Sequence, residues 1–211
     1  MDGTNKHLAA RYDAAAESWH RKIAPLGYPK AYGELVQALG QINARGFAVL
    51  DAGAGCGDFS SAFVAAHGAP KALTLLDISA DMLKAAKARL RESGVEASFI
   101  IGDIESRPAT QNYGLILCAH VVEHCPEPVA ALRALRNVLQ PDGKLLLVVS
   151  KPHWCTAIIR LIWRSKAFSP AKTRELLAEA GFETVEIYGF KAGPPSRTSM
   201  GYIATLKEKN P

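Results

Sequence analysis

The chain has 211 residues, a formal net charge of +5, and 48% hydrophobic residues. A chain of this length and composition can bury a sizeable apolar core, which excludes an intrinsically disordered protein. Its mean hydropathy is close to zero and no apolar run is long enough to cross a membrane. Residues 1–6 are polar and lack the apolar segment of a secretory signal, so we expect a cytoplasmic protein.

Cysteine and charge usage narrow the environment and the partners. Cys56, Cys118, Cys125 and Cys155 show no C-x-x-C spacing, which indicates reduced thiols rather than a disulfide framework or a metal ribbon. The Lys and Arg residues are spread along the whole chain. This distribution favours a solvated surface, and we therefore expect no nucleic-acid partner.

The N-terminal part, residues 1–44, predicts two helices. Apolar residues recur at helical spacing over Leu8–Trp19 and Tyr32–Leu39, and residues 25–29 between them contain Pro and Gly. Tyr12 and Trp19 are seven residues apart, so they fall on one face of the first helix. That face either packs into the core or covers a site.

The most informative segment follows at residues 49–60, where a hydrophobic strand end leads into Asp51 and then into Gly53, Gly55 and Gly57. Alternating glycines allow a tight turn that a ligand can approach closely, and the helix that follows is predicted over Asp58–His67. The spacing differs from the dinucleotide pattern G-x-G-x-x-G. A carboxylate here would repel a pyrophosphate but attract a sulfonium, by about 1 to 4 kcal/mol at 4 Å. The loop therefore favours S-adenosylmethionine over NAD.

Three more apolar runs predict strands that end in polar residues. Leu73–Asp77 ends in an acid 20 residues after Gly57, where a doubly wound fold presents a carboxylate to ribose hydroxyls. Ala97–Ile101 precedes Gly102, Asp103 and Ile104, and Tyr113–Ala119 precedes His120. Ligands of open α/β sheets bind outside the carboxyl ends of the strands, so these residues predict one site.

The remaining elements continue the alternation of helix and strand. Helical spacing recurs over Met82–Leu90 and Val129–Leu139, as parallel α/β crossovers require. Pro141–Gly143 predicts a turn before a buried strand at Leu145–Val149. Together these elements predict an α/β fold.

This arrangement resembles the class I S-adenosylmethionine-dependent methyltransferases, and within them the small-molecule group called methyltransferase type 11. The resemblance is strongest over residues 45–150. It implies a Rossmann-like, doubly wound, seven-stranded sheet, mostly parallel with an antiparallel last strand. Residues 182–188 and 201–206 would supply the final strands, joined by a loop at Gly193–Pro195. It also implies one domain over 1–211, with an N-terminal helical lid (1–44), a cofactor-binding core (45–150), a lid insertion (151–169), and a C-terminal helix and strands (170–211).

The resemblance also implies the contacts of the cofactor. The loop with Asp51, Gly53, Ala54 and Gly55 would surround the methionine part, and Asp77 would hold the ribose hydroxyls. The adenosine side would be lined by Ile78, Met82, Gly102, Asp103 and Ile104, and Ala119 and His120 would lie beside the methionine part. Tyr12, on the opening helix that folds over the cofactor, would lie near it. Hydrogen-bond chemistry agrees, since vicinal hydroxyls donate to a carboxylate and an adenine amino group needs an acceptor.

Catalysis of methyl transfer from a sulfonium needs little beyond alignment for in-line displacement, because orienting the reactants can supply about 7 to 11 kcal/mol. A base is needed only for acceptors that hold a proton. His120 and His124 are the candidate bases, since both follow the fourth strand and imidazole titrates near neutral pH. A structural role for His124 and a methionine contact for His120 stay open, as does the accepting atom, O, N, S or C.

His120, Glu123 and His124 would share a face if their segment were helical, and such a trio could bind a metal. The segment is similar to the E-x-x-E-H metal motif of the branch that O-methylates ubiquinone precursors, with His120 in place of the first acid. Two imidazoles suit a transition metal better than magnesium. Pro126 and Pro128 oppose an extended helix, so we predict no metal.

The insertion Lys151–Phe168 is predicted to select the acceptor, because it follows the fifth strand at the site edge and carries several aromatic residues. Its basic residues, Arg160, Arg164 and Lys166, also allow a membrane-surface contact, and the alternative is a surface helix packed inward.

The predicted function is therefore methyl transfer from S-adenosylmethionine to a small-molecule acceptor. The alternatives are a nucleic-acid methyltransferase, which the absence of an Asn/Asp-Pro-Pro-Tyr element opposes, a non-catalytic S-adenosylmethionine-binding regulatory protein, and a dehydrogenase of Rossmann type.

Overall fold

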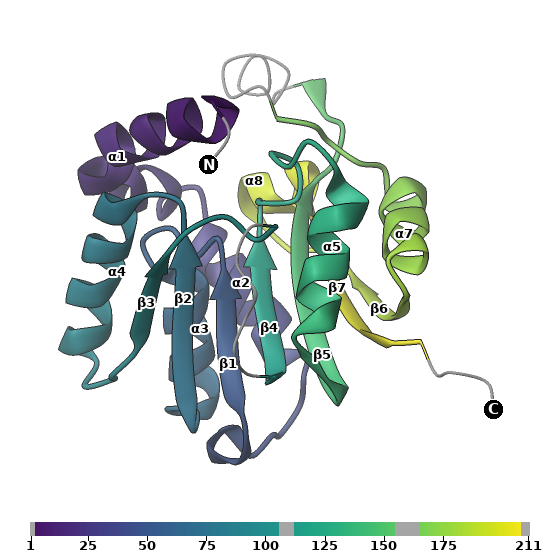
Figure 1. Ribbon diagram of the computed structural model, residues 1–211, viewed down its shortest axis with the longest axis horizontal. Helices are drawn as coiled ribbons and strands as arrows, with labels where there is room; N and C mark the ends of the chain where they lie inside the picture. The colour runs from purple at the N-terminus through teal and green to yellow at the C-terminus, as the bar shows by residue number, and fades with distance from the viewer. Residues whose placement is uncertain (1–2, 106–111, 155–164, 208–211) are drawn as a thin grey trace.

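The computed structural model describes residues 3–105, 112–154 and 165–207. Its centre is a seven-stranded sheet in the order β3-β2-β1-β4-β5-β7-β6 (Figure 1). The strands are β1 (Ala48–Ala52), β2 (Ala72–Asp77), β3 (Ser98–Ile101), β4 (Tyr113–Ala119), β5 (Leu139–Ser150), β6 (Phe182–Tyr188) and β7 (Ser199–Leu206). Only β7 in this sheet runs antiparallel to its neighbours. The predicted Rossmann-like sheet with an antiparallel last strand is confirmed.

The helices cover both faces of the sheet. They are α1 (Gly3–Ile23), α2 (Tyr28–Gln37), α3 (Asp58–His67), α4 (Ala80–Glu92), α5 (Pro128–Asn137), α7 (Pro170–Glu179) and α8 (Gly193–Thr198), with a 3₁₀ turn at Ala44–Gly46. One core joins α2, α3 and α4 to one face, and a second joins α5 and α7 to the other. Two buried faces explain why the central strands are continuously apolar rather than alternating.

Strand β4 shows how one sequence serves both cores. Leu115 and Leu117 belong to the core under α3, whereas Ile116 and Cys118 belong to the core under α5. Successive side chains of a strand point to opposite faces, so an unbroken apolar run fills both cores.

Two predicted loops are wrong. The turn expected at Pro141–Gly143 lies inside β5, where the pairing shifts from Leu139 opposite Tyr113 to Lys144 opposite Leu115. The extra residues form an irregularity in the strand rather than a connection between elements. The loop expected at Gly193–Pro195 is the start of α8, where prolines stand in the first turn, a position that proline tolerates.

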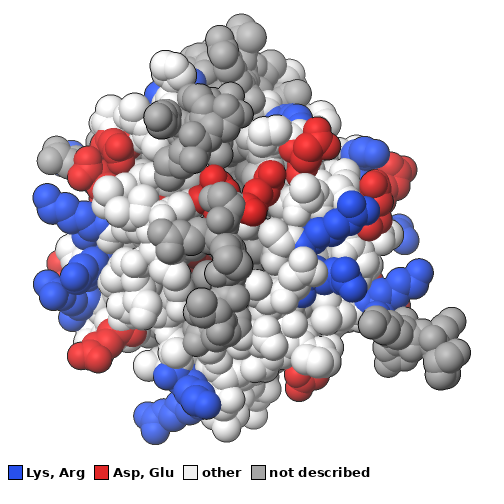
Figure 2. Space-filling view, viewed as in Figure 1, with Lys and Arg blue, Asp and Glu red and all other residues white. Residues whose placement is uncertain are grey.

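The carboxyl ends of β1, β2 and β4 lie on one edge of the sheet, and α1 lies across this edge (Figure 1). Within the described residues, no helix combines the length and the apolar character needed to cross a membrane. On the face seen in Figure 2, the Lys and Arg side chains lie mainly towards the edges, with Asp and Glu among them. The predicted membrane contact of the insertion rests mainly on residues 155–164, which lie outside the described residues.

Candidate active site

A cavity of about 690 Å³ lies between α1 and the carboxyl ends of the strands. All residues that the sequence predicts for the cofactor or for base catalysis line it: Tyr12, Asp51, Gly53, Ala54, Gly55, Asp77, Ile78, Met82, Gly102, Asp103, Ile104, Ala119, His120 and His124. Its volume falls in the range of about 300 to 1,000 Å³ that is typical of small-molecule sites. The structure thus brings the predicted residues together, while their individual roles stay predictions.

The glycine loop after β1 uses each glycine differently. Gly53, Gly55 and Gly57 all have positive φ angles, of 74°, 52° and 78°. A Cβ on Gly53 would lie 2.1 Å from Cγ2 of Val121, so this glycine lets the loop pack against the segment after β4. A Cβ on Gly55 would meet nothing within 4 Å. At Gly55 the backbone therefore faces open space that a ligand can enter.

Asp51 is buried at the end of β1 and ties this strand to α3. Its Oδ2 accepts hydrogen bonds from the backbone N–H of Ser60 at 3.1 Å and from the Ser60 hydroxyl at 2.6 Å. Burial raises the pKa of Asp51 to about 7, although the Ser60 bonds act in the opposite direction. A cationic ligand nearby would favour the ionised form. Asp51 thus has a structural contact that the sequence did not reveal.

Asp77 is held rigidly at the end of β2. Its Oδ2 accepts from the Gly55 N–H at 2.8 Å, and its Oδ1 accepts from the Ser79 N–H at 2.9 Å. Burial raises the pKa of Asp77 overall, although backbone hydrogen bonds from Ser79, Gly55 and Ile78 act in the opposite direction. Because a carboxylate offers about four acceptor sites, Asp77 keeps acceptor capacity for a hydroxyl donor of a ligand.

The first contact that sequence reasoning missed joins α1 to α4. The Ser79 hydroxyl donates to Oδ1 of Asp13 at 2.5 Å and accepts from the Met82 N–H at 3.1 Å, which caps α4. Asp13 thereby places a negative charge at the N-terminus of α4, a favourable position relative to the helix dipole. The Ser79 cap has a sequence signature, but its partner Asp13 is distant in the chain and has none.

A second missed contact joins α1 to α3 and α4. Nδ1 of His20 lies 2.6 Å from Oδ1 of Asp58, and the Arg89 guanidinium contacts both residues. Cys56 donates to Oδ2 of Asp58 at 3.0 Å. His20, Cys56 and Asp58 place possible metal-ligand atoms within 4.8 Å of one another, but Arg89 already supplies the cation that balances Asp58. The cluster of His20, Asp58 and Arg89 therefore ties α1 to α3 and α4, and we call it the latch of α1.

His120 stands directly after β4 in an unusual backbone conformation. Its φ is 58°, and it is the one non-glycine residue with positive φ in the described part of the chain. Its Nδ1 lies 3.2 Å from Oε1 of Glu123 and 3.1 Å from the Ser150 hydroxyl. Its Nε2 is buried and has no hydrogen-bond partner among the described residues. Strained backbone of this kind often marks functional positions.

Glu123 is buried below His120. Its Oε1 accepts from the Ser150 N–H at 2.5 Å, while its Oε2 has no hydrogen-bond partner among the described residues. Burial acts to raise the pKa of Glu123, but the hydrogen bond and charge of His120, together with backbone hydrogen bonds that include the one from Ser150, lower the pKa overall. Residues 120–124 contain a bend at His120 and a turn at 122–124 rather than the helix that the metal alternative requires. His120, Glu123 and His124 do not form a group of metal-ligand atoms within 4.8 Å.

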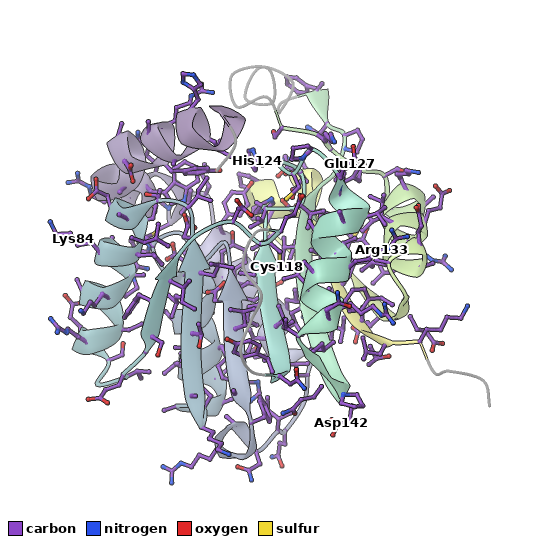
Figure 3. All side chains as sticks on the ribbon, viewed as in Figure 1. Lys84, Cys118, His124, Glu127, Arg133 and Asp142 are labelled. Carbon is purple, nitrogen blue, oxygen red and sulfur yellow. The ribbon has the colours of Figure 1, made fainter. Side chains whose placement is uncertain are left out.

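His124 faces α1 from the same turn. Figure 3 shows it beyond the end of β4, on the side of the sheet edge where α1 lies. The Tyr12 hydroxyl lies 3.3 Å from its Nε2, and the two rings meet edge to face at 6.1 Å. Burial lowers the pKa of His124, with the charge of Glu123 acting against it. This contact favours a role for His124 in holding α1.

Sequence reasoning did not assign most of the remaining cavity wall to the site. Its large apolar and aromatic members are Leu8, Trp19, Ile23, Leu26, Tyr28, Tyr32 and Phe59, and the charged residues Lys22, Asp58 and Glu105 also line it. Tyr32 stacks on Phe59 with ring centroids 4.9 Å apart, and the Tyr28 ring meets the His120 ring edge to face at 5.5 Å. The only sequence signal was the spacing of aromatic residues in the predicted N-terminal helices.

The sheet order, the glycine turn after β1 and the acid at the end of β2 define a class I methyltransferase. Comparison with known proteins points the same way. A family model described as "Methyltransferase domain" matches residues 49–143. The chain is 28% identical over 187 residues to a ubiquinone biosynthesis O-methyltransferase of Xanthomonas euvesicatoria pv. vesicatoria (strain 85-10), covering 78% of this chain and 77% of the relative.

A second relative and a solved structure agree. The chain is 31% identical over 163 residues to a ubiquinone biosynthesis O-methyltransferase of Serratia proteamaculans (strain 568), covering 72% of this chain and 66% of that relative. The fold is similar to magnesium protoporphyrin IX methyltransferase from Synechocystis PCC 6803 with bound SAH, with a TM-score of 0.78, 19% identity, and 97% and 100% of the two chains covered. The chain belongs to the class I S-adenosylmethionine-dependent methyltransferases, as the sequence predicted, and S-adenosylmethionine is its cofactor.

The residues of the cavity fit this cofactor. Asp77 retains acceptor capacity for the ribose hydroxyls, and Gly55 leaves open space next to it. Asp51 and Asp77 both line the cavity, which suits a ligand that carries a positive charge.

Proposed function

We propose that the chain transfers a methyl group to a hydroxyl group of a small, largely apolar acceptor, with His120 as the general base. The observation that carries this proposal is the buried Nε2 of His120, a residue that lines the cavity. This nitrogen has no hydrogen-bond partner among the described residues. The relatives named as ubiquinone biosynthesis O-methyltransferases support an oxygen acceptor.

The apolar wall supports the class of acceptor. Aromatic rings from α2 and α3 and aliphatic side chains from α1 would surround a planar or apolar acceptor next to His120. Burial of such a ligand gains roughly 25 cal/mol for each Å² of apolar surface removed from water. The predicted location in the cytoplasm stays a prediction.

For the cofactor, we propose that Asp77 holds the ribose hydroxyls and that Asp51 balances the positive charge near the glycine loop. Ile78, Met82 and residues 102–104 would contact the adenosine part, and Ala119 and residues 53–55 the methionine part. Tyr12, held by His124, would close the cavity from α1.

When bound, S-adenosylmethionine would supply a methyl group whose bond to sulfur breaks as the acceptor oxygen bonds to its carbon, with S-adenosylhomocysteine as the leaving group. The chain's own residues align the acceptor and exclude water, since α1 covers the cavity and is fastened through Asp13 and through His20. His120 Nε2 accepts the proton of the acceptor hydroxyl, so that the oxygen attacks as its negative charge develops. A positioned base contributes about 10² to 10⁴ in rate.

The test replaces His120 with glutamine and measures turnover with labelled S-adenosylmethionine across a panel of hydroxylated aromatic compounds. We expect kcat to fall by at least about 100-fold, while the cofactor Kd changes by less than about threefold. His7→Gln, at an exposed position of α1, is the matched control. Wild-type kcat in His120→Gln at saturating acceptor would exclude the base role.

A further inference from the structure

We infer that Glu123 is a positioning residue that keeps the proton of neutral His120 on Nδ1, leaving the lone pair of the ring on Nε2. The inference rests on two neighbouring groups. The buried Glu123 carboxylate, held by the N–H of Ser150, lies beside Nδ1 of His120, and Nε2 of the same ring has no hydrogen-bond partner among the described residues. Its catalytic consequence rests on the proposed function, while the position of the proton does not.

Glu123 is anchored to the sheet although it stands in a turn. Its Oε1 accepts from the backbone N–H of Ser150, the last residue of β5, at 2.5 Å. Strand β5 pairs with β4 on one side and with β7 on the other, so this N–H is fixed in direction. The carboxylate is therefore placed by the sheet rather than by its own flexible chain.

The anchored carboxylate decides the tautomer of His120. An ionised carboxylate has only acceptor sites, so Nδ1 of His120, at 3.2 Å from Oε1, must carry the hydrogen to bond with it. The backbone N–H of Ser150, which donates to Oε1, favours the ionised form of Glu123. The Ser150 hydroxyl, at 3.1 Å from Nδ1, can accept from the same N–H. The lone pair of a neutral ring then resides on Nε2.

The backbone of His120 directs the ring toward this arrangement. The His120 N–H donates to the Val148 carbonyl at 2.8 Å, which continues the β4–β5 pairing by one residue. The φ of 58° then turns the chain so that the side chain reaches both Glu123 and the cavity. An α-L conformation is disfavoured for a histidine, and the contacts with Glu123 and Ser150 hold it in place.

The titratable groups around His120 come from three elements. Glu123 and His124 belong to the turn after β4, Tyr28 meets the ring from α2, and Tyr12 contacts His124 from α1. Among these groups, Glu123 places a carboxylate oxygen within hydrogen-bond distance of a ring nitrogen of His120. Its replacement is therefore the informative change.

The first experiment reads the tautomer of ligand-free protein by NMR with ¹⁵N-labelled histidine, and His120→Gln assigns the His120 signals. We expect the neutral wild-type ring to carry its proton on Nδ1. In Glu123→Gln, the Ser150 N–H needs an acceptor, so the amide oxygen should take the position of Oε1. This oxygen can still accept from Nδ1–H of His120, so we expect that tautomer to be retained. In Glu123→Ala it is lost in favour of Nε2–H or a mixture. Ser150→Ala keeps the backbone N–H and should keep the tautomer.

The second experiment compares kcat and acceptor KM. We expect Glu123→Ala to lower kcat at least about tenfold with little change in KM, and Glu123→Gln to restore part of kcat.

A wild-type ring protonated on Nε2, or an unchanged tautomer in Glu123→Ala, would overturn the inference; if Glu123→Ala does not fold, the wild-type spectrum alone decides. Wild-type kcat in Glu123→Ala, with loss of turnover in His120→Gln, would overturn the inference and leave the proposed function standing. Wild-type kcat in His120→Gln would overturn the proposed function alone.

Discussion

Replacing Asp77 with alanine tests the cofactor site at its most rigid point. The carboxylate is oriented by the Gly55 and Ser79 N–H groups at 2.8 and 2.9 Å, so its remaining lone pairs have fixed directions. A hydrogen bond to a charged group contributes about 1.5 to 3 kcal/mol. Loss of one such bond to ribose raises Kd about 10- to 150-fold.

The assay is calorimetric titration of the protein with S-adenosylmethionine. Asp77→Asn should bind as weakly as Asp77→Ala, because its amide NH₂ would face one of the two N–H donors that now meet a carboxylate oxygen. Asp142→Ala is the matched control, since Asp142 is exposed and Figure 3 shows it at the opposite end of the sheet from His124. Unchanged Kd in a folded Asp77→Ala protein would refute the reasoning.

Three further changes test other parts of the site. The pKa of Asp51 is raised from 3.8 to about 7. Between these two pH values the folded protein holds a proton that the unfolded chain has released, so the free energy of unfolding of the wild type should fall as pH rises through this window. Asp51→Asn, whose amide oxygen can accept both Ser60 bonds, should lose this component of the pH dependence in denaturant titrations, and equal slopes would contradict it. Gly55→Ala and Gly94→Ala place a Cβ at positive φ with nothing within 4 Å, so both should lose about 1 to 2 kcal/mol of stability, but only Gly55→Ala should weaken cofactor binding. Arg89→Ala should speed hydrogen exchange in α1 because Asp58 and His20 lose their shared partner, whereas exposed Arg91→Ala should not; equal exchange would argue against the latch.

Regular elements could be predicted from the sequence because local pattern and burial agree there. Helix α3 and strands β4 and β6 have the predicted bounds. Gly57 starts α3 with a positive φ, and the unbroken apolar run of β4 meets cores on both sides. Both signals are local in sequence, so pattern and turn chemistry were sufficient.

The remainder depends on contacts between distant residues. The Asp13 carboxylate meets Ser79 across 66 positions, and His20 meets Asp58 across 38. Neither pairing leaves a periodic pattern. In the same way, the position of Asp51 before the glycines predicted a contact with the cofactor, but it did not predict that Oδ2 accepts two hydrogen bonds from Ser60 of α3. The spacing of His120, Glu123 and His124 suggested a helical face, but the segment turns too sharply to form one.

The central claim is that the cavity holds the cofactor on Asp77 with the reacting centre beside His120. A crystal structure of the protein with S-adenosylhomocysteine tests it most directly. We expect ribose hydroxyls within hydrogen-bond distance of the Asp77 carboxylate and the sulfur directed into the part of the cavity that His120 lines. A ribose bound away from Asp77, or a sulfur directed away from His120, would contradict it.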